Sequence, residues 1–71
     1  MLVNVAPGSE ESVVSSLRNE KGVKEVNQLY GLYDLLVVVE GNTEQEVKSI
    51  ISEKMRGNPG VIATITMKVV G

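Results

Sequence analysis

One stretch near the middle of the chain constrains the fold more than any other. Residues 35–39 are five consecutive aliphatic side chains, and they lie between Gly31 and Gly41. A short apolar run that is rich in β-branched residues and bounded by glycines is typical of a β-strand rather than a helix. Side chains alternate between the two faces of a strand, so both faces of this one are apolar. We therefore predict a strand over 33–40 that is buried on both faces.

The size and composition of the chain predict that it needs a further source of stability. A single domain of 71 residues is near the lower size limit, where only about 60% of the unfolded surface is buried on folding. The chain has no Cys and no His, which excludes a disulfide, a zinc staple, thiol chemistry and imidazole chemistry. We expect no metal and no cofactor. Oligomerisation is the remaining source of stability, and we predict it here.

Charge and hydropathy argue against two classes of partner. The formal net charge is −2, and the Lys and Arg residues are scattered singly, so no basic stripe is available to release counterions from a DNA duplex. We expect no direct contact with nucleic acid. No apolar segment approaches the ~20 residues of a membrane span, and the N-terminus lacks the pattern of a secretory signal. We therefore expect a cytoplasmic protein with no membrane partner.

Turn residues and helix caps divide the chain into six elements. Strands are predicted over 2–5, 23–29, 33–40 and 61–70, and helices over 9–20 and 43–56. Ser9 is a candidate cap for the first helix, and Thr43 with Glu46 has the spacing of a capping box. The order β-α-β-β-α-β predicts one α+β domain over residues 1–71 with the ferredoxin-like fold.

This fold leaves one face of the sheet bare. Right-handed crossovers place the first and third strands in the middle of a four-stranded antiparallel sheet, with both helices on one face. Leu35, Val37 and Val39 are expected under the helices, and Leu36 and Val38 on the open face. An exposed apolar patch of this kind ordinarily marks an interface, so we predict dimerisation through the open face.

The last predicted strand alternates in polarity. One of its faces is expected to join the core, formed by Val61, Ala63, Ile65, Met67 and Val69. The opposite face is expected to carry Ile62, Thr64, Thr66 and Lys68.

Four short segments, taken in order, carry a family resemblance over essentially the whole chain. They are a first strand ending in Pro-Gly at 7–8, Gly-Val-Lys-Glu-Val at 22–26, Gly-Leu-Tyr-Asp at 31–34, and Asn-Pro-Gly-Val at 58–61 followed by Thr-x-Thr at 64–66. The chain resembles the effector-binding (RAM) domain of the Lrp/AsnC feast-famine transcription regulators. Family regulators carry a helix-turn-helix domain ahead of this module. Because Met1 stands almost at the first strand, we expect a stand-alone module without that domain.

The resemblance implies a function as well as a fold. It implies non-enzymatic binding of a small effector, with a free amino acid as the leading candidate, at the subunit interfaces of an oligomer built as a ring of dimers. A helix-turn-helix regulator of the same family is a candidate partner by co-assembly. The matching ligand-binding residues are Tyr30, Gly31, Leu32, Tyr33, Asp34, Thr64 and Thr66.

These residues suit a zwitterion, and each also has a purely structural explanation. Backbone N–H groups around Gly31 could bind a carboxylate, while Asp34 and Thr64 could receive an ammonium group. Equally, Gly31 could serve only a hairpin turn, Asp34 could be a solvated turn residue, and the threonines could simply be edge-strand residues.

Two other functions use the same element order. One is a small dimeric enzyme of the cofactor-free monooxygenase or isomerase type, which typically needs a buried ionisable group such as His; this chain has no His. The other is an ACT-type amino-acid-binding regulatory domain, against which the Gly-Leu-Tyr-Asp segment argues. Heavy-metal transfer domains of this fold are excluded by the missing Cys pair.

Overall fold

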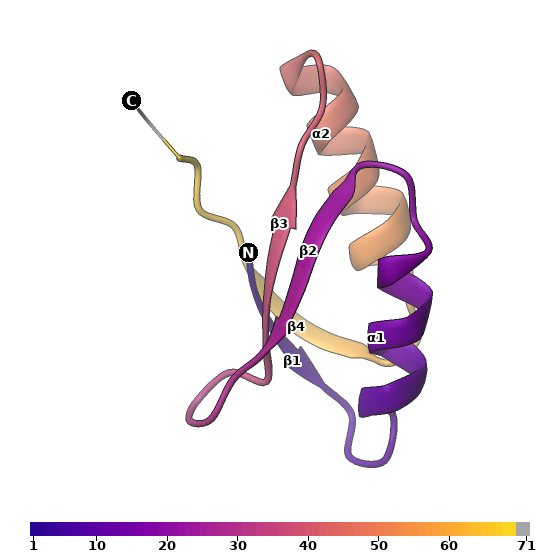
Figure 1. Cartoon of the computed structure of the whole chain (residues 1–71), viewed down its shortest axis with the longest axis vertical. Helices are drawn as coiled ribbons and strands as arrows, with labels where there is room; N and C mark the ends of the chain where they lie inside the picture. Colours follow the sequence, from indigo (N-terminus) through magenta and orange to yellow (C-terminus); the bar gives the residue numbers. More distant parts are fainter. Residues whose placement is uncertain (70–71) are drawn as a thin grey trace.

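The computed structural model describes residues 1–69 and has the predicted ferredoxin-like fold (Figure 1). Its elements are β1 (Leu2–Val5), α1 (Glu10–Arg18), β2 (Val23–Gln28), β3 (Leu35–Val39), α2 (Glu44–Ile50), the π-helical segment η1 (Ile51–Met55) and β4 (Val61–Ile65). The sheet order is β2-β3-β1-β4, with all neighbours antiparallel. Both helices cover one face of the sheet (Figure 1), so the predicted fold class is confirmed.

The two central strands are the most apolar ones, as predicted. Leu35 and Val37 of β3 are almost fully buried under the helices, whereas Leu36 and Val38 are half-buried on the open face. The core consists of Met1, Val3, Val5, Val13, Val14, Leu17, Val26, Leu35, Val37, Ile51 and Met55. The polar strand β2 lies at the edge of the sheet, where its charged side chains remain in water.

The face assignment predicted for the last strand is wrong after its first residue. Val5 pairs with Val61, but Asn4 pairs with Ala63, so Ile62 is an extra residue that forms an irregularity in the ladder. Such a bulge reverses the alternation that follows it. Thr64 therefore pairs with the buried Val3 on the helix-covered face, and Ala63 and Ile65 lie on the open face.

The last strand is also shorter than predicted. β4 ends at Ile65, next to the start of β1, because Leu2 pairs with Ile65. Thr66, Met67, Lys68 and Val69 follow without strand structure and are exposed. Val70, the predicted end of the strand, lies outside the described residues.

The two helices begin differently. At α2, Thr43 Oγ1 accepts a hydrogen bond from the Glu46 N–H at 3.1 Å, as in the predicted capping box, and Glu46 Oε2 accepts one from the Asn42 N–H at 2.8 Å. At α1, Ser9 occupies the N-cap position but its side chain makes no capping hydrogen bond. The glutamates in the first turn of α1 still favour the positive end of the helix dipole.

The second helix contains a π turn that the sequence pattern did not predict. The Arg56 N–H donates to the Ile51 carbonyl oxygen at 3.0 Å, a five-residue step. Ile51 and Met55, at the two ends of η1, are both buried in the core. The π turn therefore accompanies the most deeply buried part of this helix, since in α2 itself Val47 is only partly buried against the core.

Substituting Leu17→Ala tests this packing, because Leu17 is fully buried in α1. We expect the free energy of unfolding to fall by about 3 kcal/mol or more, through lost apolar burial and a residual cavity. Ser15→Ala, an exposed substitution in the same helix, is the control and should change it by less than about 0.5 kcal/mol. Chemical denaturation measures both. Equal midpoints for the two variants would contradict the packing described here.

Candidate functional site

The predicted ligand-binding segment is the hairpin loop between β2 and β3. The Leu29 N–H donates to the Asp34 carbonyl oxygen at 2.8 Å and closes the loop over residues 30–33. Gly31 has φ +127°, a conformation that side chains with a Cβ rarely adopt. The loop extends from the lower end of the sheet in Figure 1, so the predicted hairpin turn is confirmed.

Asp34 ties the base of this hairpin to β1. Its carboxylate Oδ2 accepts a hydrogen bond from the Val5 N–H at 2.7 Å, and its own N–H donates to the Val3 carbonyl oxygen at 3.0 Å. The side chain is half-buried. At the end of β1, the Asp34 carboxylate takes the place of a backbone carbonyl as the acceptor for the Val5 N–H. The other carboxylate oxygen of Asp34, Oδ1, makes no hydrogen bond among the described residues. Asp34 therefore fixes the base of the loop through one of its two carboxylate oxygens.

The tip of the hairpin is apolar and has no cover from its own chain. Tyr30 is fully exposed, Leu32 is 89% exposed, and Leu29 is exposed at the base of the loop. Tyr33 is half-buried. Single exposed apolar residues are common, but two large ones on one loop form a small apolar surface in contact with water.

The two predicted threonines lie apart from the hairpin. Thr64 pairs with Val3, which pairs with Leu35 beside the hairpin base. Thr64 is therefore two strands away from that base, or about 10 Å. Thr66 lies beyond the end of β4, further from the hairpin. One chain thus brings residues 30–34 together, but it does not bring Thr64 and Thr66 into the same site.

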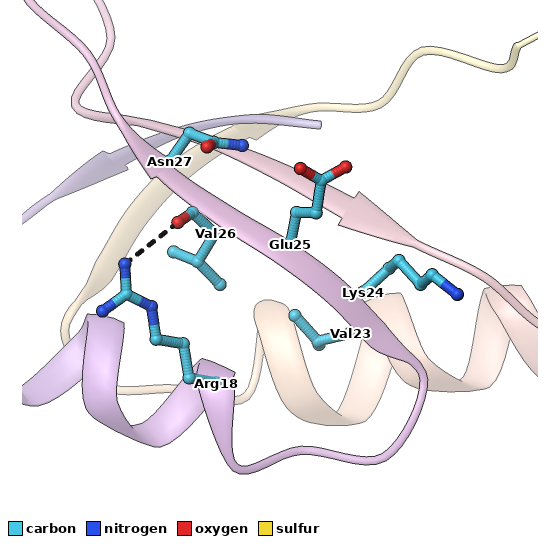
Figure 2. A pocket seen from close by; sticks show the side chains of 6 residues that line it. All are labelled: Arg18, Val23, Lys24, Glu25, Val26 and Asn27. Atoms are coloured by element: carbon cyan, nitrogen blue, oxygen red, sulfur yellow. Dashed lines mark hydrogen bonds between the residues drawn. The ribbon is translucent and has the colours of Figure 1, made fainter.

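Two shallow hollows border the edge strand β2. The hollow in Figure 2 has a volume of about 320 Å³ and is lined by Arg18, Val23, Lys24, Glu25, Val26 and Asn27. The second lies between α1 and the end of β2, with a volume of about 410 Å³, and is lined by Glu11, Val14, Ser15, Arg18, Asn19 and Gln28. We call the second one the α1–β2 hollow. Both volumes fall within the range of about 300–1,000 Å³ found for ligand sites.

Arg18 lines both hollows. Its guanidinium Nη2 donates to the Val26 carbonyl oxygen at 3.2 Å, the dashed line in Figure 2, and this bond holds the side chain against the edge of β2. Sequence reasoning missed Arg18, because a cation in the last turn of a helix is already explained by the helix dipole. Only the position of β2 beside α1 gives it a further neighbour.

Three other cations form ion pairs at the surface. Lys24 pairs with Glu40 at 3.5 Å and Lys54 with Glu20 at 3.6 Å. Lys68 Nζ donates to Glu44 Oε1 at 2.7 Å, and this hydrogen bond and charge lower the pKa of Glu44 below its usual value. Exposed pairs of this kind contribute little to stability.

Residues 1–69 contain neither a candidate metal site nor a membrane-spanning helix. No group of three or more His, Cys, Asp or Glu side chains in this part of the chain could hold a metal ion. No helix in this range is long and apolar enough to cross a membrane.

Solved structures with the same fold identify the family. The chain is 38% identical to the protein in the crystal structure of FFRP-DM1, with a TM-score of 0.93 over 97% of this chain and 92% of that one. It is 37% identical to the hypothetical protein PHS023 from Pyrococcus horikoshii, with a TM-score of 0.89 over 99% and 86% of the two chains. A scan against family models and a search of curated proteins found no match.

The fold is that of a small regulatory-type domain with the ferredoxin-like architecture. On the strength of these matches, the chain belongs to the Lrp/AsnC-like FFRP family.

Substituting Asp34→Ala tests the tie between hairpin and β1. It leaves the Val5 N–H without its acceptor, so we expect the free energy of unfolding to fall by about 1–3 kcal/mol. Asp34→Asn keeps a carbonyl acceptor at the same place and should lose less, while Glu25→Ala on exposed β2 is the surface control. Thermal or chemical unfolding of the three variants gives the order of their stabilities. Equal stability for Asp34→Ala and Glu25→Ala would show that this hydrogen bond contributes nothing.

Proposed function

We propose that this protein is a non-enzymatic sensor module that binds a free α-amino acid at the hairpin loop, where copies of the chain meet. Membership of the FFRP family supports a regulatory role. The observation that carries the proposal is the hairpin itself, which combines an exposed apolar tip with backbone groups around a positive-φ glycine. The resemblance of the sequence to the RAM effector-binding domain agrees with this role.

The chemistry of the loop fits the three parts of an amino acid. Backbone N–H groups at the Gly31 turn can donate to a carboxylate, and Asp34 Oδ1 can accept from an ammonium group. Tyr30 and Leu32 offer apolar surface to an aliphatic or aromatic side chain. The threonines of β4 are too far from this loop in one chain to join it, so we place them as ligand contacts only where a second chain approaches.

The open face of the sheet is the surface at which we propose that a second copy binds. Leu36, Leu2 and Ile65 form one row across the open face of the sheet, because Leu2 pairs with both of the others. Leu2 and Leu36 are half-buried, and Ile65 is 44% exposed. We propose that two sheets pack through this face, that such dimers associate further into a ring, and that a helix-turn-helix regulator of the same family can co-assemble with it.

We also propose that the module does not catalyse a reaction. The hairpin offers Asp34 and two tyrosines as its ionisable groups; Tyr30 is fully exposed, and Tyr33 and Asp34 are only half-buried. Groups that carry out general acid–base catalysis typically lie in a cleft whose burial and neighbouring charges tune them to the reaction. Fixed hydrogen-bonding groups suit binding better.

A calorimetric screen of the common amino acids tests the binding role. We expect at least one to bind the assembled protein, and Gly31→Ala to weaken that binding because the turn changes conformation. Gly8→Ala is a matched control, since Gly8 also has a positive φ and open space around its Cβ position. If none of the amino acids binds, the proposed ligand class is wrong.

The mass of the protein in solution tests the assembly. We expect a dimer or a ring of dimers at micromolar concentration, and Leu36→Lys should shift the population to smaller species because it puts a charge on the open face. Ser52→Lys, on the exposed surface of η1, should leave the mass unchanged. A stable monomer of the unmodified chain by light scattering would contradict dimerisation through this face.

A further inference from the structure

The outer edge of β2 is a place where a foreign strand could add to the sheet. β2 has six residues, which makes it the longest strand within residues 1–69, and it lies at the edge of the sheet. An edge strand leaves every second backbone N–H and C=O without a partner in the sheet, and a strand from another molecule can pair with these groups. We therefore asked which groups face outward here and what lies against them.

The strand register identifies the outward groups. The Met1 amino group donates to the Val37 carbonyl oxygen at 2.7 Å, and the Val37 N–H donates to the Met1 carbonyl oxygen at 2.8 Å. The backbone of Val37 therefore faces β1, and its partner in β2, Val26, points its own N–H and C=O away from β3. Gln28, two residues further along β2, faces the same way. Val26 and Gln28 thus define the free edge.

Arg18 already occupies this edge at Val26. Its Nη2 donates to the outward carbonyl oxygen of Val26 at 3.2 Å, and Figure 2 shows the side chain reaching from α1 to the strand. The guanidinium therefore lies where the N–H of an added strand would have to lie. A strand that pairs with β2 must first displace this charged group, and charge at an edge is a known obstacle to strand addition.

The other features of the edge protect only one end of it. The pairing register shifts within residues 23–25, so the ladder is irregular there, but over residues 25–28 it is regular. Side-chain charge does not close this regular part. If two copies paired antiparallel about Val26, Glu25 of one would lie opposite Asn27 of the other, and like charges would not meet. Arg18 stands against the part of the edge that the irregularity leaves open.

We propose that Arg18 closes the free edge of β2 against strand addition by a second copy of the chain, and so confines self-association to other surfaces. The hydrogen bond to the Val26 carbonyl oxygen holds the guanidinium in the blocking position. When Arg18 is removed, that acceptor is free and two β2 edges can pair antiparallel. This role goes beyond the proposed function and does not depend on ligand binding.

Substituting Arg18→Ala tests the blocking role, with Arg56→Ala as the matched loss of one exposed cation. Light scattering at equal protein concentration gives the mass of each assembly. We expect the weight-average mass of Arg18→Ala to be at least about twice that of the unmodified protein, because each opened edge recruits a further copy, and that of Arg56→Ala to be unchanged. Equal masses for the two variants would overturn the proposal.

A second substitution shows whether the new contact uses the edge of β2. Gln28→Pro removes an outward N–H that an added strand would need, while the hydrogen bonds between β2 and β3 do not use this group. In the Arg18→Ala background, Gln28→Pro should return the mass to that of the unmodified protein. If the mass stays high, the copies associate through another surface and the proposal is wrong.

Leu17→Ala separates edge pairing from association caused by instability. This variant loses core packing but keeps Arg18. At a temperature where circular dichroism shows both variants to be fully folded, we expect Leu17→Ala to keep the mass of the unmodified protein. Assemblies of Leu17→Ala as large as those of Arg18→Ala would overturn the role of Arg18.

Hydrogen exchange of single amides gives a direct view of the edge. In the assemblies of Arg18→Ala, we expect the Val26 and Gln28 N–H groups to exchange at least about tenfold more slowly than in the unmodified protein. The N–H groups of Glu25 and Asn27 already face β3 and should change little. Equal slowing of all four amides, or of none, would contradict strand pairing at this edge. If the unmodified protein binds no amino acid, the proposed function fails, and these measurements still decide the role of Arg18.

Discussion

The apolar character of β3 on both of its faces is the constraint on which the rest of the structure depends. Leu35 and Val37 pack beneath the helices among the core side chains, and this packing fixes the position of β3 in the middle of the sheet. The same alternation leaves Leu36 and Val38 on the opposite face, which no helix covers (Figure 1). One short apolar strand thus organises the core and also creates a surface that a chain of this size cannot cover itself.

The hairpin, like β3, combines a part that is fixed within the fold with an apolar part that its own chain does not cover. Asp34 fixes the base of the loop to β1, while the apolar tip stays in water. The base of the loop is therefore fixed, while its tip has no cover from its own chain. In the function proposed above, ligand binding and association of copies at this loop stabilise each other by mass action.

Most of the fold follows from local patterns in the sequence. The apolar run before Gly41, the glycines at strand ends and the capping box at Thr43 each act over a few residues, and the structure confirms the elements that they predict. The sequence pattern failed where the outcome depends on distant partners. The extra residue at Ile62 is defined only by pairing with β1, so alternation alone put Thr64 on the wrong face. Arg18 was overlooked for the same reason, since its bond to Val26 exists only once β2 lies beside α1.

The extra residue in β4 also determines which side chains border the open face of the sheet. With regular alternation after Val61, the open face would receive Ile62 and Thr64 in place of Ala63 and Ile65, and Thr64 would stand beside Leu2. The bulge instead turns the hydroxyl toward the helices and turns Ile65 outward, beside Leu2 and Leu36. The extra residue therefore places an isoleucine, in place of a threonine, next to Leu2 in the row that crosses the open face. The face through which we propose that two copies pack is thus defined partly by the register of the last strand, and not only by the composition of the chain.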